Sequence, residues 1–447
     1  MKSQLIKNAQ MVNEGKTQLA DVRITNQFIE CIAANITPSI NDDVIDAKGA
    51  YLLPGMIDDQ VHFREPGLTH KGSILTESRA AVAGGITSYM EMPNVTPSTT
   101  NKAALEEKYA IAEQHSYANY SFYLGATEHN LDDIKALDPK KVCGVKVFMG
   151  ASTGNLLVEN PQALEGIFRE CPVLIVTHCE DGKTISKNNQ RYEQQGIIPN
   201  ITDHPKIRDA EACYASSSYA VSLAKKYNAQ LHVLHITTEK ELSLFTKGDI
   251  ANKSITAEAC IHHLYFSEQD YEALGNLIKC NPAIKANTDR DALINAVKNN
   301  QIDIIATDHA PHTWQEKQTD YVNAPAGLPL VEHALLSLLE HVKHNRLSIE
   351  QVVEKTAHNP ALRFKVDKRG FIKEGYYADL VLISTQQTTK VSHDACRYLC
   401  GWTPFDEVEF SSKIVSTWVN GERLYDGKTV TKPSKPSKPA MPLVFNR

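Results

Sequence analysis

The sequence predicts an α/β protein: a (β/α)8 TIM barrel with a small β-sandwich-like domain built from both termini. In the middle of the chain, apolar β-type runs alternate with amphipathic helical stretches. Strands that are apolar along their whole length are typical of parallel sheets whose two faces are both covered. Both ends carry short β-type runs separated by turns, and 447 residues suffice for more than one domain.

Eight strands are expected in the middle of the chain, which favours a closed barrel over an open sheet. Helix-like segments such as NKAALEEKYAIAEQH and TDRDALINAVKNN separate them. The predicted strands are Met56–His62, Ile86–Glu91, Tyr120–Leu124, Val142–Met149, Val173–His178, Gln230–Ile236, Ser254–Glu258 and Ile302–Asp308.

The two ends of the chain differ from the middle in the secondary structure that their sequence predicts. Segments such as QLADVRI near the start and KIVSTWVNGERLYDGK near the end are too short and irregular for helices. We therefore expect residues 1–54 and 366–447 to form one discontinuous β-rich domain, and residues 55–365 to form the barrel. The stretch TKPSKPSKPAMP is expected to be an extended, solvated tail, with a role in subunit contact as the less favoured alternative.

The composition indicates which partners and which cellular compartment to expect. The 47 basic and 53 acidic residues give a net charge of −6, so a nucleic-acid partner is not expected. Nine cysteines without a CxxC pair indicate a reducing compartment rather than a disulfide framework. No signal-peptide core and no apolar run of about 20 residues is present, so a cytoplasmic protein without a membrane partner is predicted. A homo-oligomer is compatible with the sequence.

Five polar residues fall on or at the ends of predicted barrel strands: His62, Lys146, His178, His235 and Asp308. Barrel enzymes assemble their active sites at the carboxyl-terminal rim of the strands. One histidine at a strand end is more often structural, but three histidines and an aspartate converging on one rim predict a metal site. Imidazole and carboxylate ligands favour Zn²⁺, and a catalytic zinc site leaves a position open for water.

Lys146 needs a separate explanation because an ammonium group is repelled by a metal ion. A neutral amine that captures carbon dioxide becomes a carbamate, whose two oxygens can bridge two cations. The alternative for Lys146 is an ordinary ion pair inside the barrel.

The remaining histidines are expected to have other roles. His232 lies three residues before His235, so we expect it to face away from the site and pack against a helix. His262 and His263 are assigned to a loop, with a supporting hydrogen bond to the site as an alternative. The following are expected at the surface: His115, His204, His341 and His344.

The segments QVHFREPGLTHKG, MEMPNVTP, GVKVFMG, THCED, LHITT and ATDHAPH resemble, in this order and spacing, those of the amidohydrolase superfamily. Within it they are similar to the class I dihydroorotases. The resemblance runs from about Pro54 to Pro360, and the β-rich ends match that family's small flanking domain.

This resemblance implies a role for each matching position. His62 would bind one metal, His178 and His235 a second, and carboxylated Lys146 would bridge the two. Asp308 would be both a metal ligand and the catalytic proton carrier. The substrate-binding positions implied are Arg64, Asn94, Asn281, His312 and Gly327. The implied reaction is the reversible cyclisation of N-carbamoyl-L-aspartate to L-dihydroorotate in pyrimidine biosynthesis.

One position departs from the family pattern. The expected HxH motif reads QVH, with Gln60 in place of the first histidine. A neutral amide is a poorer zinc ligand than imidazole, so either one or two zinc ions per chain are compatible with the sequence. Two rivals remain: a hydantoinase or allantoinase, and a non-catalytic scaffold homologue. The polar stretch 313–326 is long enough to suggest a mobile loop.

Overall fold

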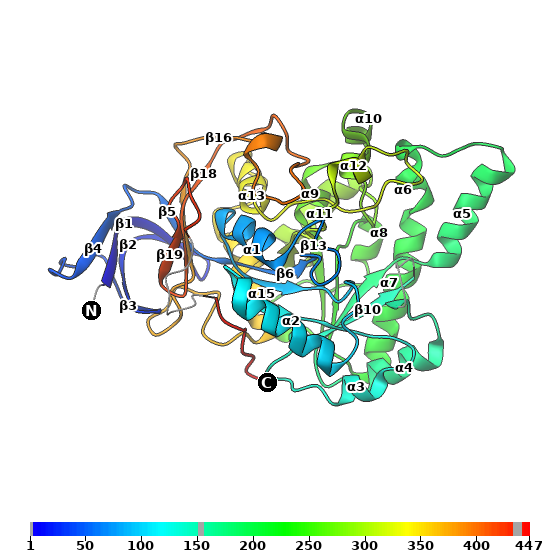
Figure 1. Cartoon of the computed structure of the whole chain (residues 1–447), viewed down its shortest axis with the longest axis horizontal. Coiled ribbons are helices and arrows are strands. Elements are labelled where there is room, and N and C mark those ends of the chain that lie inside the picture. Colours follow the sequence, from blue (N-terminus) through cyan, green and yellow to red (C-terminus); the bar gives the residue numbers. More distant parts are fainter. Residues whose placement is uncertain (1–2, 151–155, 432–439) are drawn as a thin grey trace.

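The computed structural model describes residues 3–150, 156–431 and 440–447. It consists of a strand-rich part containing the N-terminus and a larger part in which helices surround a ring of strands (Figure 1). The chain runs from the first part into the second and returns to the first near its end, so that blue and red strands lie beside one another in the figure.

The larger part is a parallel β-barrel. A three-stranded sheet, β6-β7-β8, continues into a six-stranded sheet of β9 to β14, since only Tyr123 separates β8 from β9. The strands are β6 (Met56–Val61), β7 (Ile86–Glu91), β8 (Asn119–Phe122), β9 (Leu124–Gly125), β10 (Val145–Met149), β11 (Ile175–Cys179), β12 (Leu231–Val233), β13 (Ile255–Cys260) and β14 (Ile304–Ala306).

The barrel closes between β6 and the residues that follow β14. Val61 forms a parallel bridge with His309, and the backbone N–H of His62 donates to the His309 carbonyl at 2.7 Å. Thr307 adds a side-chain clamp, donating from its backbone N–H and its hydroxyl to the buried carboxyl of Asp58. Each predicted strand has its counterpart in this ring, and the observed strands are mostly shorter than predicted.

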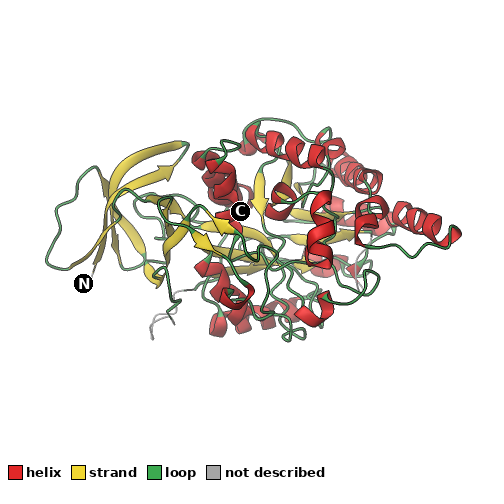
Figure 2. Cartoon of the chain, turned by 90° about the horizontal axis from the view of Figure 1, so that it is seen from above, coloured by secondary structure: helices red, strands yellow, loops and turns green. Residues whose placement is uncertain are grey.

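Helices cover the outside of the barrel (Figure 2). Several begin at side-chain caps, including a capping box at Ser73 and single caps at Asn101 and Asp209, which satisfy backbone N–H groups of the first turn. The main helices are α1 (Ile74–Ala83), α2 (Lys102–His115), α4 (Pro161–Glu170), α5 (Gly182–Gln194), α7 (Ala210–Tyr227), α11 (Asn287–Lys298), α13 (Ala334–Lys343) and α15 (Asn359–Phe364). Shorter ones are α3 (Leu131–Lys135), α6 (His204–Ile207), α8 (Glu239–Leu242), α9 (Ile261–Tyr265), α10 (Tyr271–Leu274), α12 (Trp314–Lys317) and α14 (Ile349–Val353).

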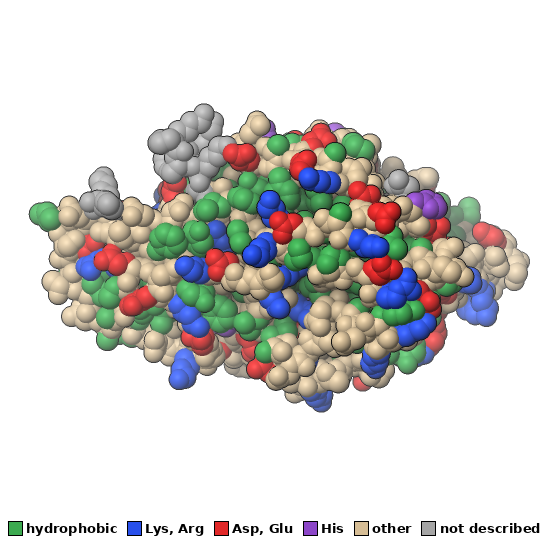
Figure 3. All heavy atoms as spheres, turned by 90° about the horizontal axis from the view of Figure 1, so that it is seen from below, with side chains coloured by type: hydrophobic (Ala, Val, Ile, Leu, Met, Phe, Trp, Pro, Cys, Tyr) green, Lys and Arg blue, Asp and Glu red, His purple; other side chains and the backbone are tan. Residues whose placement is uncertain are grey.

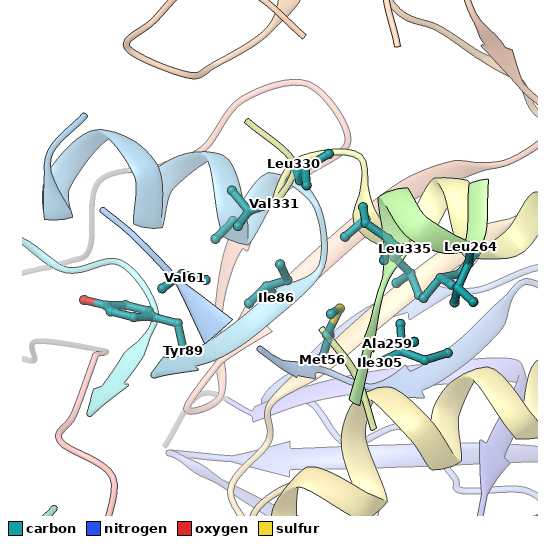
Figure 4. Packing of buried hydrophobic residues seen from close by; sticks show 14 of the residues in the cluster. Met56, Val61, Ile86, Tyr89, Ala259, Leu264, Ile305, Leu330, Val331 and Leu335 are labelled. Carbon is teal, nitrogen blue, oxygen red and sulfur yellow. The ribbon is translucent and has the colours of Figure 1, made fainter. Parts of the chain in front are cut away.

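A continuous apolar core fills the space between the strands and the helices. Figure 4 shows Met56 and Ile86 on neighbouring strands, together with Leu335 on α13, all buried within one cluster. Burying such side chains stabilises the fold by about 1.5–3 kcal/mol each. The core fixes the strand positions, and thereby the side chains at the strand ends.

The second part is built on an eight-stranded sheet that takes strands from both ends of the chain. β5 pairs antiparallel with β15, with Leu52 opposite Leu382, so residues far apart in sequence share one sheet. Its strands are β1 (Ser3–Asn13), β2 (Lys16–Thr25), β3 (Phe28–Ala33), β4 (Asp42–Asp46), β5 (Tyr51–Pro54), β15 (Leu380–Ser384), β18 (Lys413–Val419) and β19 (Glu422–Tyr425). A separate pair is β16 (Thr389–Lys390) with β17 (Glu409–Phe410).

Parts of the C-terminal region contact the barrel. The indole of Trp402 donates to the carbonyl of His312 at 2.7 Å, and the backbone N–H of Leu443 donates to Tyr120. Most of the Pro/Lys-rich segment expected to be an extended tail, residues 432–439, lies outside the described residues. On the face in Figure 3, basic and acidic side chains are interspersed. Among the described helices none is long and apolar enough to cross a membrane.

Candidate active site

The structure brings the five residues expected at the metal site to one end of the barrel. His62 follows β6, Lys146 lies on β10, His178 on β11, His235 follows β12 and Asp308 follows β14. His235 and Asp308 have left-handed backbones, with φ of 38° and 51°. Non-glycine residues adopt this conformation only where the surroundings compensate its cost of about 1–3 kcal/mol, and such residues cluster at functional sites.

A cavity of about 230 Å³ opens among these side chains. Its lining includes four of the five expected metal-site residues and Gln60, while Lys146 is not part of the lining. All five expected substrate-binding positions contribute to the wall: Arg64, Asn94, Asn281, His312 and Gly327. The cavity size suits a small molecule.

His178 and His235 form a pair whose nitrogens face each other. Nδ1 of His178 lies 3.0 Å from Nε2 of His235, and the second nitrogen of His178 lies 3.1 Å from Glu180 Oε2. Although burial opposes ionisation of Glu180, Arg208 and His178 lower its pKa to about 2. A carboxylate that accepts the Nε2–H of His178 leaves the Nδ1 lone pair facing His235, which is the usual support for a metal-binding imidazole.

Lys146 is buried and unpaired. Only 1% of its surface is exposed, and its Nζ lies 4.7 Å from the ring centroid of Phe148. In the described part of the chain no carboxylate forms an ion pair with this amine, so the ion pair expected as the alternative is absent there. Burial lowers the pKa of Lys146 to about 8, which makes its neutral form accessible near neutral pH.

Gln60, His62 and Asp308 form a hydrogen-bonded group on the other side of the cavity. The amide of Gln60 donates to Asp308 Oδ1 at 3.1 Å, and Nε2 of His62 lies 3.0 Å from the same oxygen. Nδ1 of His62 is 2.7 Å from Asn94 Oδ1. Burial alone would raise the pKa of Asp308, but its hydrogen bond to His62 and the nearby positive charges lower it below the usual value, so Asp308 is ionised in this arrangement.

Arg64 supplies a buried positive charge to the cavity. Its backbone φ is 72°, and its guanidinium donates to the Pro311 carbonyl at 3.0 Å and lies 3.1 Å from His312 Nε2, which is also 3.0 Å from the Ala326 carbonyl. Burial lowers the pKa of Arg64 to about 10, which still leaves it charged at neutral pH. Lys71 contacts the other nitrogen of His312 at 3.1 Å and pairs with Glu316 at 2.9 Å. Two cations therefore flank His312, and after burial they help to lower its pKa to about 3.

The segment expected to be a mobile loop contains helix α12 and is held by two lysines, Lys317 within the segment and Lys279 outside it. Nζ of Lys317 donates to the carbonyls of Pro325 and Gly327 at 2.9 and 3.0 Å. Lys279 donates in the same way to Tyr321 and Ala324. Gly327 has φ of 143°, and an added Cβ would lie 2.4 Å from the Ala310 carbonyl, so the close approach of this backbone to the cavity requires glycine.

Comparison with known proteins decides the family. Residues 51–424 match the amidohydrolase family. The chain is an amidohydrolase. It is 32% identical to a dihydroorotase of Methanosphaera stadtmanae over 435 residues, covering 97% of this chain and 98% of the relative. A Staphylococcus aureus dihydroorotase is 31% identical over 433 residues, covering 95% and 99% of the two chains.

Solved structures support the same fold. An L-hydantoinase (dihydropyrimidinase) from Arthrobacter aurescens superposes with a TM-score of 0.91 at 26% identity, covering 97% of this chain and 98% of that one. A dihydropyrimidinase from Brevibacillus agri shares the fold with a TM-score of 0.86, 23% identity and 96% coverage of both chains. The predicted TIM barrel with a separate β domain is confirmed, and this amidohydrolase belongs to a family that is generally metal-dependent.

Several expectations about the other histidines of this amidohydrolase were wrong. His232, on β12, does pack against a helix, since its ring lies 6.2 Å from that of Phe364 at the end of α15, but it faces Asp59 and Glu258 in the barrel interior, because the left-handed backbone at His235 breaks the alternation between the two histidines. His262 and His263 belong to α9 and are buried. His204 and His341 are also buried, at 2% and 4% exposure, since each lies on an inward-facing helical position.

Sequence reasoning missed Glu180, which orients His178. It stands two residues after His178 in THCED. A carboxylate so near a metal-binding histidine was a usable signal, because such histidines commonly hydrogen-bond to an acid. Cys280 and Phe148, which also line the cavity, carried no comparable signal.

Proposed function

We propose that this amidohydrolase is a dihydroorotase of class I, which interconverts N-carbamoyl-L-aspartate and L-dihydroorotate in pyrimidine synthesis in the cytoplasm. Dihydroorotases at 31–32% identity over nearly the full chain support the proposal. Conserved fold alone would not distinguish one cyclic amide substrate from another.

Arg64 is the observation that carries the substrate assignment. In the described part of the chain its guanidinium forms no ion pair, although it is buried beside the cavity. A buried unpaired guanidinium costs several kcal/mol unless a ligand supplies an anion. Dihydroorotate and carbamoyl aspartate both carry such a carboxylate, which a guanidinium binds with two parallel hydrogen bonds. Asn94 lines the same wall and offers its amide N–H groups, because its oxygen is engaged by His62.

The donor set of the cavity fits a divalent zinc ion. His178 Nδ1 and His235 Nε2 would hold one ion, while His62 and Asp308 would hold a second if it binds. Lys146 would complete the donor set as a carbamate, because its amine is buried, has no ion-pair partner among the described residues and has a lowered pKa. Carboxylation joins the amine nitrogen to carbon dioxide and releases one proton. When bound, the metal would polarise the scissile carbonyl and acidify the attacking water.

Asp308 is positioned to move the proton. In the hydrolytic direction its carboxylate accepts a proton from the attacking water and returns it to the departing ring nitrogen. In the synthetic direction the same group begins protonated and donates to the hydroxyl that leaves the acid. Arg64 and Asn94 hold the substrate's carboxylate meanwhile, and His312 contributes a neutral ring beside Arg64.

Substrate assays test the proposal directly. The purified enzyme should hydrolyse L-dihydroorotate at least 100-fold more efficiently than hydantoin or allantoin. Arg64→Met should raise the KM for dihydroorotate by about 100-fold, since a charged hydrogen-bonded pair contributes roughly 1.5–3 kcal/mol, while metal content stays unchanged. Arg169→Met, at an exposed arginine, is the matched control and should leave KM as in the wild type. A normal KM in Arg64→Met would overturn the substrate assignment.

A hydantoinase is the second candidate, because the Arthrobacter aurescens L-hydantoinase superposes so closely. A hydantoin ring lacks the exocyclic carboxylate that Arg64 would bind. Preferential hydrolysis of hydantoins, unaffected by Arg64→Met, would favour this candidate. A non-catalytic scaffold rests only on Gln60, and any metal-dependent turnover excludes it.

A further inference from the structure

Beneath the rim, the barrel interior holds three ionisable side chains that are completely buried. Asp59 lies on β6, His232 on β12 and Glu258 on β13, and each has an exposure of 0%. Nε2 of His232 is 3.3 Å from Asp59 Oδ2 and 3.6 Å from Glu258 Oε2. One potential ligand atom from each residue lies within 4.8 Å of the other two. None of the three has a role in the proposed reaction.

The atoms that face each other have no hydrogen-bond partner. Within the described structure this holds for both carboxylate oxygens of Asp59, for Nε2 of His232 and for Oε2 of Glu258. Buried polar atoms are almost always paired, and an unpaired buried carboxylate is especially costly. We therefore expect a positively charged partner at the centre of the cluster, which would compensate the buried carboxylates.

Thr256 sets the orientation of the histidine ring. Its Oγ1 lies 2.8 Å from Nδ1 of His232 and 3.4 Å from the carbonyl of Leu231. The hydroxyl proton goes to that carbonyl, so the hydroxyl oxygen accepts the Nδ1–H of His232. Nε2 then carries the lone pair, on the side of the ring that faces Asp59 and Glu258, as in metal sites where a neighbouring acceptor fixes the histidine tautomer.

A proton on Nε2 is the competing explanation. Burial lowers the pKa of His232, but Asp59 and Glu258 raise it to about 9. A proton needs an acceptor near the N–H axis. Asp59 Oδ2 lies 3.3 Å from Nε2, yet it is not aligned to accept the N–H. Burial and the charge of Asp59 raise the pKa of Glu258 to about 7, so a second proton on Glu258 belongs to this competing explanation, which the metal measurements below test.

A metal ion requires the opposite arrangement, with the ion on the lone-pair axis and the oxygens to its sides. In a tetrahedral zinc site with bonds of about 2.0–2.2 Å, neighbouring ligand atoms lie about 3.3–3.6 Å apart. The two distances from His232 Nε2 fall within this range. A divalent cation would also balance both carboxylates.

We propose that Asp59, His232 and Glu258 bind a divalent cation, zinc by their donor set, at a site separate from the catalytic one. The ion would hold Glu258, whose other oxygen accepts the backbone N–H of His235 at 3.0 Å. His232 and Asp59 would thus be positioning residues for a catalytic-site histidine with a left-handed backbone.

Anomalous diffraction tests the proposal on crystals of the wild-type holoenzyme, independently of substrate. Data collected above and below the zinc absorption edge should give a peak between the three side chains, in addition to any peak at His178 and His235. No peak between Asp59, His232 and Glu258 would overturn the proposal, and it would do so even if the catalytic site is fully loaded.

Metal analysis of variants provides a second test. His232→Gln should contain one zinc ion per chain fewer than the wild type, and His341→Gln, at a buried histidine elsewhere, should lose none. Thr256→Val retains all three ligands and should weaken zinc binding at this site about 10-fold through loss of ring orientation. This milder variant covers the case in which His232→Gln does not fold. Wild-type zinc content and affinity in His232→Gln or Thr256→Val would contradict the proposal.

Discussion

The two sides of the active-site cavity differ in how their polar atoms are satisfied. On one side, which we call the imidazole pair, ring nitrogens of His178 and His235 face each other at 3.0 Å, with Glu180 holding His178 from behind. On the other side, which we call the carboxylate group, Gln60 and His62 both contact Asp308 Oδ1. The first side is held by one hydrogen bond between two imidazoles, which a cation can replace, whereas the second satisfies a carboxylate through two hydrogen bonds.

This difference indicates unequal metal affinities. A cation at the imidazole pair gains two nitrogens without breaking a hydrogen bond to a carboxylate. A cation at the carboxylate group must displace contacts that Asp308 already makes, and Gln60 offers no imidazole in return. We therefore expect one firmly bound ion and a second, weaker one, and the following predictions address this asymmetry.

The largest effect is expected from removing the imidazole pair. His178→Ala should abolish tight metal binding and lower kcat/KM by roughly 10³-fold or more, because the metal supplies much of the transition-state stabilisation. His62→Ala should retain more than half of the wild-type metal after dialysis. Metal analysis and initial rates on identically purified proteins measure both, with the exposed His115→Ala as control. Equal metal loss in His178→Ala and His62→Ala would show that the two sides are equivalent.

Asp308→Asn separates proton transfer from metal binding. The amide has nearly the same shape as the carboxylate but cannot accept the proton, so kcat should fall by about 10²–10⁴-fold. Metal at the imidazole pair should stay at the wild-type level, because Asp308 does not contact that pair. Asp320→Asn, on the surface, is the matched control. A kcat within tenfold of the wild type would assign the proton to another group.

The sequence predicted most of the fold because periodic apolar patterns report directly on buried strands. All expected barrel strands are present, and their order placed His62, Lys146, His178, His235 and Asp308 at one rim. Chain geometry that depends on local departures from regular strands was not predictable in this way. His232 is the clearest case, since strict alternation placed His232 and His235 on opposite faces, while the left-handed backbone at His235 breaks that alternation.

Contacts between distant segments could not be predicted from the sequence pattern either. Arg208 pairs with Glu180 from a position 28 residues away, and nothing local to either residue marks the partnership. The buried lysines Lys279 and Lys317 look like surface residues in sequence, yet they hold backbone carbonyls of the 313–328 segment. Such lysines are exceptions to the usual exposure of charged residues, so composition could not reveal them.

Lys146 lies on β10, beside the strand that carries His178, and its titration gives a pH prediction. Carboxylation requires the neutral amine, whose fraction rises with pH and reaches one half at the pKa of about 8. At a fixed concentration of dissolved carbon dioxide, reactivation of metal-free, carbon dioxide-depleted enzyme should therefore be about 50-fold faster at pH 8 than at pH 6. Intact-mass measurement of the carbamate and recovery of activity follow the reaction. Lys146→Gln should show neither, and a pH-independent rate would contradict a titrating amine.

The smallest effect on turnover is expected from Gln60→His, which restores an imidazole to the carboxylate group. The change removes the amide donor from Asp308 and adds a nitrogen ligand beside His62, so a second metal ion should remain bound after dialysis. Because the proton carrier and the imidazole pair are unchanged, kcat should change by less than about tenfold. Gln60→Leu removes the same donor without adding a ligand, and it should not gain metal. If the wild-type enzyme already retains two ions as firmly as Gln60→His, the hydrogen bonds of the carboxylate group do not weaken metal binding, and the proposed asymmetry is wrong.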